Sequence, residues 1–188
     1  MTVPRLTRSR RGRPSWARRQ GELLLSLAEL LEALPASAAE RPGLRPEVTA
    51  LDLARSVAVA VVPKTRRRDA AAADLAETAA LIRQAAVERL TARPQVSARE
   101  LGAVLADAWE LAASAGRPLT VDPAVSRAAA EERLRRAPLA IRMGVRGRRL
   151  IAADAGWEIG RGEPLAGSAA AIVLYLHGRG RLPSRDAP

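Results

Sequence analysis

A chain of 188 residues without cysteine suits one sizeable domain or two small ones, and it excludes disulfide bonds, thiolate metal sites and cysteine nucleophiles. Phenylalanine is absent and only three Trp and one Tyr supply aromatic bulk, so the core must be built from Leu, Ala, Val and Ile, which favours closely packed helices. No stretch approaches the roughly 18 apolar residues of a membrane span, so we expect a soluble, cytoplasmic protein.

The net charge of +11 is concentrated in two groups of cations, which lie within residues 5–19 and 64–68 and contain no acid. Their central members are Arg10, Arg11, Arg13, Arg66, Arg67 and Arg68. Such groups can bind the phosphates of nucleic acid through counterion release. They can equally be a disordered arm and a solvated loop. No groove-reading motif accompanies them, which favours the second interpretation. The remaining 20 cations and 20 acids make the body of the chain neutral.

The N-terminal half shows helical periodicity after a polar beginning. Residues 1–15 are dominated by Arg, Pro, Ser and Gly, which predicts a disordered basic arm. From Trp16 to Leu34, leucines recur on one stripe and predict a first helix that Pro35 ends. A second helix is expected to begin after Thr49, whose hydroxyl can accept a hydrogen bond from the backbone at the helix start.

Two further helices complete a predicted bundle. Residues 69–92 carry apolar side chains at spacings of three or four and predict one continuous helix. Ser97 and Glu100 fit a capping box, and the helix that they open is expected to run to about Ala115 and end at Gly116. Four such helices joined by short loops predict a helical bundle, followed by a linking helix that starts at 122–123.

Beyond Pro138 the period of the pattern changes. Leu139, Ile141, Met143 and Val145 alternate with small or charged residues, as in a half-buried strand. A second strand is expected over 149–153 and a third at the Trp157 segment. Ser168 is then expected to cap a short apolar helix that ends at Gly178, which gives an α+β unit of about 50 residues.

Two stretches of the sequence are similar to a known family. The first stretch contains Trp109, Leu111, Ala112, Gly116, Arg117, Pro118, Asp122 and Pro123. The second runs from Trp157-Glu158-Ile159 through Ala166-Gly167-Ser168 to His177-Gly178-Arg179. They resemble the actinobacterial proteins related to mycothiol-dependent maleylpyruvate isomerase, and the resemblance covers roughly residues 16–182.

The resemblance implies a fold and a division of the chain. The implied class is α+β, with an N-terminal DinB-like four-helix bundle followed by a small sterol-carrier-protein-like α/β unit. The expected parts are the basic arm at 1–15, the bundle at 16–136, the small α+β domain at 137–182 and a tail at 183–188. Members of the family continue into a further strand, so the second domain is expected to be truncated.

In that family two His and one Glu bind a divalent metal, which is thought to activate mycothiol as a thiolate. The resemblance places those ligands at Ser56, Ala103 and Asp107, so all three are replaced. Ala103 offers no donor atom and one carboxylate cannot hold zinc, so we predict no metal, no cofactor and no catalytic residue. An all-oxygen set of Asp52, Asp107 and Glu110 would favour only a weakly bound hard cation.

The residues expected to line a cleft are Asp52, Arg55, Trp109 and Glu110. Asp107 and Glu110 are three apart on one helical face, where two carboxylates can act as an acid–base pair. The alternative is that Glu110 lies near Arg117 while Asp107 faces solvent or pairs with Arg55. His177, the only histidine, is expected to decorate the end of the last helix.

The resulting prediction is a non-catalytic, metal-ligand-deficient relative of this family, a pseudoenzyme that binds an unknown small molecule or protein partner. One alternative is a basic accessory protein that binds nucleic acid through the Arg groups. Another is an active mycothiol-dependent isomerase or transferase with an altered site, which requires Asp52, Asp107 and Glu110 to share one pocket. The sequence does not indicate the oligomeric state.

Overall fold

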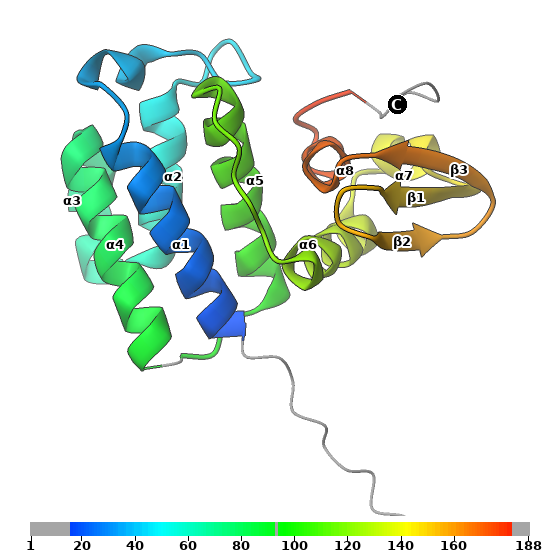
Figure 1. Ribbon diagram of the computed structural model, residues 1–188, viewed down its shortest axis with the longest axis horizontal. Helices are drawn as coiled ribbons and strands as arrows, with labels where there is room; N and C mark the ends of the chain where they lie inside the picture. The colour runs from blue at the N-terminus through cyan, green and yellow to red at the C-terminus, as the bar shows by residue number, and fades with distance from the viewer. Residues whose placement is uncertain (1–15, 93, 182–188) are drawn as a thin grey trace, which may run out of the picture.

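The structure is a computed structural model that describes residues 16–92 and 94–181. Within these residues the protein is of the α+β class, as predicted, and Figure 1 shows helices gathered on one side and a small sheet with its helices on the other. The predicted arm at 1–15, with Arg10, Arg11 and Arg13, and the tail at 183–188 lie outside the described residues.

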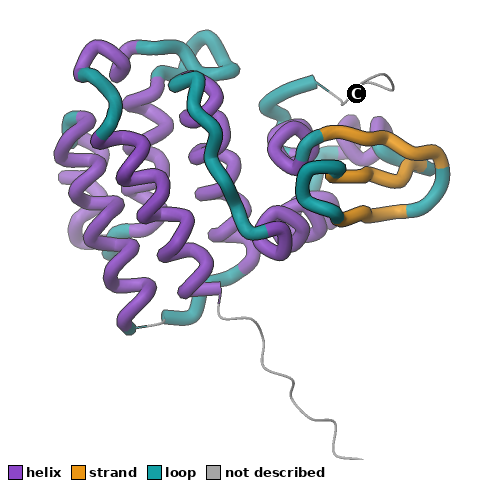
Figure 2. Tube along the Cα trace, in the orientation of Figure 1, coloured by secondary structure: helices purple, strands orange, loops and turns teal. Residues whose placement is uncertain are grey.

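Four long helices pack side by side as a bundle (Figures 1 and 2). They are α1 (Trp16–Glu32), α2 (Ala50–Val61), α4 (Leu75–Thr91) and α5 (Ala98–Ser114). Helix α1 packs mainly on α4, and α2 packs mainly on α5. The leucines that predicted the first helix point inward, and Leu24, Leu27 and Leu31 are buried. The bundle therefore has an aliphatic core, as the absence of Phe requires.

Side-chain caps fix where the helices begin. Thr49 accepts a hydrogen bond from the backbone N–H of Asp52, and Ser97 accepts one from that of Glu100. In both cases the acidic side chain accepts from the cap's own backbone N–H, which completes a capping box. The predicted caps at Thr49 and Ser97 are confirmed, and Gly116 adopts the positive φ expected just beyond the end of α5.

The prediction of one helix over 69–92 is wrong. A 3-10 turn, η2 (Lys64–Arg66), leads into the short helix α3 (Arg67–Ala72), and α4 starts afresh at Leu75. The break occurs because Asp74 caps α4 by accepting from the backbone N–H of Glu77, while Glu77 accepts in return from the backbone of Asp74. A second 3-10 helix, η1 (Ala36–Glu40), lies between α1 and α2.

The rest of the chain forms the small sheet and the helices around it. Helix α6 (Pro123–Arg136) is capped by Asp122 and packs on α5. The sheet consists of β1 (Arg148–Ala152), β2 (Trp157–Gly160) and β3 (Glu163–Gly167), and α8 (Ala169–Leu176) follows it. The strand order is β2-β1-β3, with β1 antiparallel to β2 and parallel to β3. The predicted cap of Ser168 on the last helix is confirmed, since its hydroxyl accepts from the N–H of Ala171.

One face of the sheet is covered and apolar. Leu150 pairs with Ile159 on β2 and with Leu165 on β3, so the three side chains share a face. Leu150 and Leu165 are buried there, and α8 and α6 contact the sheet. The strand predicted over 149–153 and the strand at Trp157 are confirmed, whereas β3 was not predicted.

The strand predicted over Leu139–Val145 is wrong. These residues form the short helix α7 (Leu139–Gly144), in which Arg142 N–H donates to Pro138 O and Val145 N–H to Ile141 O. An alternating pattern this short also places Leu139 and Met143 four residues apart on one helical face, so it fits either period. In the structure that face is exposed, at 71% for Leu139 and 54% for Met143.

The described helices include none that combines the length and apolar character needed to cross a bilayer.

A buried hydrogen bond joins the sheet to α6, which packs on the bundle. Trp157 Nε1 on β2 donates to Ser126 Oγ on α6 at 2.9 Å, and both side chains are buried. Helix α6 in turn lies close to α5, because a Cβ added to Gly102 would lie 3.4 Å from the Cβ of Ala129. The position of the sheet relative to the bundle therefore depends on α6.

We predict that Ser126→Ala lowers the free energy of unfolding by about 1–3 kcal/mol, because it leaves the buried Trp157 N–H without an acceptor. Urea unfolding followed by tryptophan fluorescence measures this. Ser114→Ala is the matched control, since that hydroxyl donates only to Leu111 O of its own helix. Equal effects of the two substitutions would show that the bond to Trp157 contributes nothing specific.

Candidate functional site

Two carboxylates are buried on α5, and they define the candidate site. Asp107 is 5% exposed and Glu110 is fully buried, and no other acidic residue of the described chain is as enclosed. Burying a carboxylate is costly unless a cation and hydrogen bonds compensate for the lost water. The partners of these two side chains therefore determine what the site can do.

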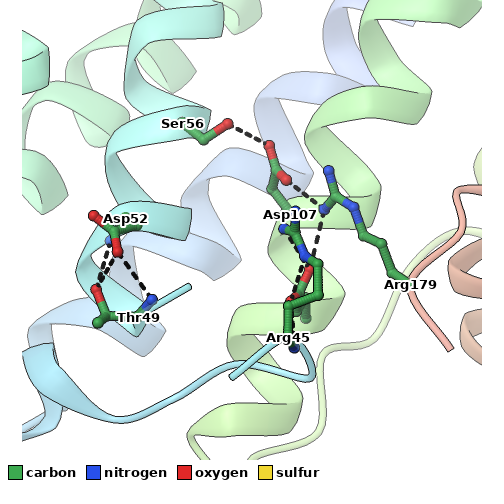
Figure 3. A network of polar contacts seen from close by, with 7 residues as sticks. Arg45, Thr49, Asp52, Ser56, Asp107 and Arg179 are labelled. Carbon is green, nitrogen blue, oxygen red and sulfur yellow. Dashed lines mark hydrogen bonds and ion pairs between the residues drawn. The ribbon is translucent and has the colours of Figure 1, made fainter. Parts of the chain in front are cut away.

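Asp107 is held by a hydroxyl and by an arginine. Ser56 Oγ on α2 donates to Asp107 Oδ2 at 2.7 Å, and Arg179 Nη1 forms an ion pair with Asp107 Oδ1 (Figure 3). Arg179 lies just beyond α8, so the C-terminal part of the chain contacts α5 of the bundle through this side chain (Figure 3). Asp107 thus ties α2, α5 and the segment after α8 together.

Glu110 is held by two arginines. Arg45 Nε donates to Glu110 Oε1 at 3.1 Å and Arg45 Nη2 to Oε2 at 3.0 Å, which is the bidentate geometry that suits a guanidinium and a carboxylate. Arg179 Nη1 reaches Glu110 Oε2 at 3.3 Å, so Arg179 bridges the two carboxylates. The hydrogen bonds to Glu110 raise the pKa of the Arg45 guanidinium further above its ordinary value.

The loop that carries Arg45 presses against the Glu110 carboxylate. The backbone N–H of Arg45 donates to Glu110 Oε1 at 3.3 Å, and a Cβ added to Gly43 would lie 2.9 Å from that oxygen. A side chain at position 43 would therefore force the Glu110 carboxylate to move. A bridge between Pro42 and Thr49 closes the base of the loop.

The three positions that the resemblance aligns with metal ligands are only partly brought together. Ser56 and Asp107 are in contact, whereas Ala103 lies one turn earlier on α5 and lines a separate pocket. A hydroxyl, a methyl group and a carboxylate that already pairs with Arg179 are not a donor set for zinc. No group of three His, Cys, Asp or Glu side chains within residues 16–92 and 94–181 is arranged to hold a metal ion.

The other residues expected in the cleft lie elsewhere. Asp52 points away from Asp107 and toward Thr49, and hydrogen bonds from Thr49 lower the pKa of this carboxyl (Figure 3). Arg55 donates to the carbonyl oxygens of Ala73 at 2.7 Å and Ala72 at 3.3 Å. The structure therefore does not bring Asp52 together with Asp107 and Glu110.

Two of the alternatives weighed for the carboxylates are corrected by these contacts. Asp107 pairs with Ser56 and Arg179 rather than facing solvent or Arg55, and Glu110 pairs with Arg45 and Arg179 rather than lying beside Arg117. Trp109 is buried on α5, and its Nε1 donates to Leu119 O at 3.3 Å, outside the network.

Sequence reasoning missed both arginines of the network. Arg179 lies in the His177-Gly178-Arg179 motif, where only a helix end was recognised, and Arg45 lies in an irregular loop. One feature of the sequence did point to such partners: two acids lie three residues apart on an apolar helix, and buried acids need nearby cations. That signal gives the type of partner and not its position.

A cationic pocket lies between α5, α6 and the end of α8. Its volume is about 500 Å³, and Ala103 lies in its wall. The charged residues that line it are Arg99, Arg133, Arg136, Arg179 and one acid, Glu132, together with the His177 ring. Glu132 pairs with Arg136 at 2.7 Å and also with Arg135. Arg99 forms no direct ion pair with a carboxylate among the described residues, although its charge, after those of Arg135 and Arg136, also lowers the pKa of Glu132. The pocket therefore has an excess of positive charge.

The His177 ring lies in this pocket, half-enclosed by the protein. Its Nε2 is buried and has no hydrogen-bond partner among the described residues. Burial, followed by the nearby charges of Arg133 and Arg179, lowers the pKa of His177 to about 4. Arg133 is fixed beside it by donating to Leu176 O at 3.0 Å. The expectation that His177 lies at the end of the last helix is confirmed, and its pocket was not foreseen.

The described members of the second Arg group lie on η2 and α3. Arg66 Nη1 donates to Gln84 Oε1 at 2.8 Å, and Arg67 and Arg68 are exposed. Their binding to nucleic acid stays a prediction.

No protein-family model matches this chain, and no curated protein matches it. Two crystal structures of mycothiol-dependent maleylpyruvate isomerase, one of them a histidine-to-alanine mutant, align with 89% of this chain and 90% of theirs. Their sequence identity to this chain is 15% and the TM-score is 0.47. Similarity at this level does not assign a family, so the function has to be argued from the residues.

We predict that Arg45→Met lowers the free energy of unfolding by about 3 kcal/mol, because it removes the bidentate partner of a buried carboxylate. Adding Glu110→Gln to that variant should recover part of the loss, since the amide carries no charge. Chemical denaturation measures both. Arg127→Met, which breaks an exposed pair with Glu131, should cost far less, and a similar cost for both would contradict the role of burial.

We also predict that the His177 ring makes stability depend on pH. The unfolded chain takes up the proton at the ordinary value of 6.5 and the folded protein only at about 4. The contribution of the neutral ring to the free energy of unfolding is therefore complete above pH 6.5. It decreases as the pH falls from 6.5 to about 4 and changes no further below that value. Because the ring is partly exposed to solvent, which weakens the effect, we expect the free energy of unfolding to decrease by about 2 kcal/mol over this range.

The measurement is denaturation of the wild type and His177→Gln over this pH range. Because the chain has one histidine, the difference between the two curves isolates its contribution. Parallel curves would mean that the ring titrates alike in both states.

Proposed function

We propose that this protein is a non-catalytic relative of the mycothiol-dependent maleylpyruvate isomerases that binds a small anionic ligand in the cationic pocket. The observation that carries the proposal is the position of Arg179, which bridges Asp107 and Glu110 and also lines the pocket beside Ala103. The kinship rests on the sequence motifs around Trp109 and around 157–179, and the positions aligned with metal ligands, Ser56, Ala103 and Asp107, carry other residues.

Metal-dependent chemistry does not fit these side chains. The carboxylate of Asp107, the one remaining donor with charge at the aligned positions, is neutralised by Arg179 and hydrogen-bonded to Ser56. A guanidinium at that place repels a divalent cation and occupies the carboxylate lone pairs that a metal would need. The network resembles a structural ion-pair cluster, which fixes the C-terminal segment on the bundle.

The same arginine chemistry favours an anion in the neighbouring pocket. Guanidinium groups present planar pairs of donors that match carboxylate and phosphate oxygens. Arg99 has no carboxylate partner among the described residues, and Arg133 uses its Nε on Leu176 O, which leaves its two terminal nitrogens available for a ligand. A volume of about 500 Å³ is in the range of small-molecule sites.

His177 supplies a built-in reporter for this proposal. A bound anion would offset the charges of Arg133 and Arg179, which now disfavour protonation of the ring. We predict that phosphate or a small dicarboxylate raises the pKa of His177 from about 4 toward its ordinary value. The measurement is an NMR titration of the single histidine with pH, in the presence and absence of each anion.

The control variants separate the pocket from the rest of the basic surface. Arg99→Gln and Arg133→Gln should abolish the anion-dependent shift, whereas Arg67→Gln, on the exposed α3, should leave it intact. A shift that persists in Arg99→Gln and Arg133→Gln would contradict binding in this pocket. Stoichiometric zinc in the purified protein, or turnover that a chelator abolishes, would contradict the non-catalytic assignment.

A further inference from the structure

A second hollow lies on the other side of α6, and the proposed ligand site does not use it. It has a volume of about 770 Å³ and is formed by the end of α6, by α7 and by the start of β1 with the end of β2. Its apolar lining includes Leu134, Leu139, Met143 and Ile159. We call this hollow the α7 groove.

The apolar side chains of the α7 groove are unusually exposed. Leu139 is 71% exposed and Met143 is 54% exposed, and only Leu44 and Val87 are comparable among the large hydrophobic residues that the structure describes. Because they are four residues apart on α7, the two side chains form one continuous strip. Covering such a strip is favourable by about 25 cal/mol per Å² of apolar surface.

The strip is not a consequence of a loosely placed helix. On its other side α7 is packed against the core through Ile141, and Val145 just after it is buried. Gly144 lies so close to the Tyr175 hydroxyl of α8 that a side chain there would collide with it. Helix α7 is thus packed on one side, and its Leu139 and Met143 side chains lie on the exposed side.

Cations surround the strip. Five arginines line the α7 groove: Arg135, Arg142, Arg146, Arg148 and Arg161. None of the described residues that line it is acidic. Arg135 pairs with Glu132, whereas Arg142, Arg146 and Arg161 form no ion pair with a carboxylate of residues 16–92 or 94–181. An occupant must therefore combine apolar groups for the centre with negative charge for the rim.

We propose that the α7 groove docks an acidic amphipathic segment of a partner protein, with apolar side chains on Leu139 and Met143 and carboxylates on the arginine rim. A second copy of this chain would bring the same cations to the contact, so charge disfavours it. A flat bilayer surface does not fill a hollow, and the lining contains no aromatic ring on which a nucleic-acid base could stack. A short amphipathic helix or strand meets the shape, the apolar lining and the charge together.

The test uses a fluorescein-labelled synthetic peptide in which leucines at helical spacing alternate with glutamates. Two matched peptides replace the leucines with serine or the glutamates with glutamine. Fluorescence anisotropy should show that the first peptide binds and that affinity falls as salt rises. Leu139→Ser with Met143→Ser should weaken binding about tenfold or more, and Arg142→Gln with Arg146→Gln should weaken it similarly and reduce the salt dependence.

Control variants carry the same changes elsewhere on the surface. Leu44→Ser with Val87→Ser removes two comparably exposed apolar side chains, and Arg67→Gln with Arg68→Gln removes two exposed cations. Both should bind the peptide as the wild type does. The groove variants should keep the response of His177 to small anions, so failure here is distinguishable from failure of the proposed ligand site.

Several results would overturn the proposal. One is absence of peptide binding at millimolar concentration, and another is equal binding of the serine-substituted peptide, which would indicate charge alone. A further one is binding that the groove variants leave unchanged. Preferential binding of anionic vesicles or duplex DNA through the same residues, or dimerisation that Leu139→Ser with Met143→Ser abolishes, would assign the groove to a different occupant.

Discussion

The need to neutralise two carboxylates inside the protein determines how its parts are held together. Asp107 and Glu110 are enclosed in the C-terminal half of α5, and an uncompensated charge there would cost several kcal/mol. Arg45 comes from the loop before α2 and Arg179 from the segment after α8, so two distant stretches of sequence converge on this helix. The same pairings that stabilise the interior also occupy the oxygens that a metal ion would require.

Much of the fold could be predicted because its signals are local. The caps at Thr49, Ser97 and Ser168 are hydrogen bonds within three residues, so the sequence contains both partners. The failures occurred where the local pattern was ambiguous. Residues 69–92 kept their helical spacing across the break that Asp74 introduces, and α7 was too short for its alternation to exclude a helix.

The candidate site was predictable only in part, for a related reason. Asp107 and Glu110 were identified from their spacing on a helix, and the contact of Asp107 with Ser56 links two aligned ligand positions. Their arginine partners are 65 to 72 residues away in sequence, and no periodicity relates a loop to a distant helix. The pocket beside Ala103 was equally hidden, since its cations come from α5, α6 and the segment after α8.

Helix α6 contributes arginines to both cationic surfaces, the cationic pocket and the α7 groove, although the chain outside the two Arg groups has balanced charge. Residues 123–181 contain 11 arginines and five acids, so the neutrality predicted for the body conceals a local excess. Glu132 offsets part of it by pairing with Arg135 and Arg136, while Arg133 and Arg136 face the cationic pocket and Arg135 faces the α7 groove. One helix therefore separates the cationic pocket from the larger α7 groove, and Glu132 pairs with an arginine on each side of it.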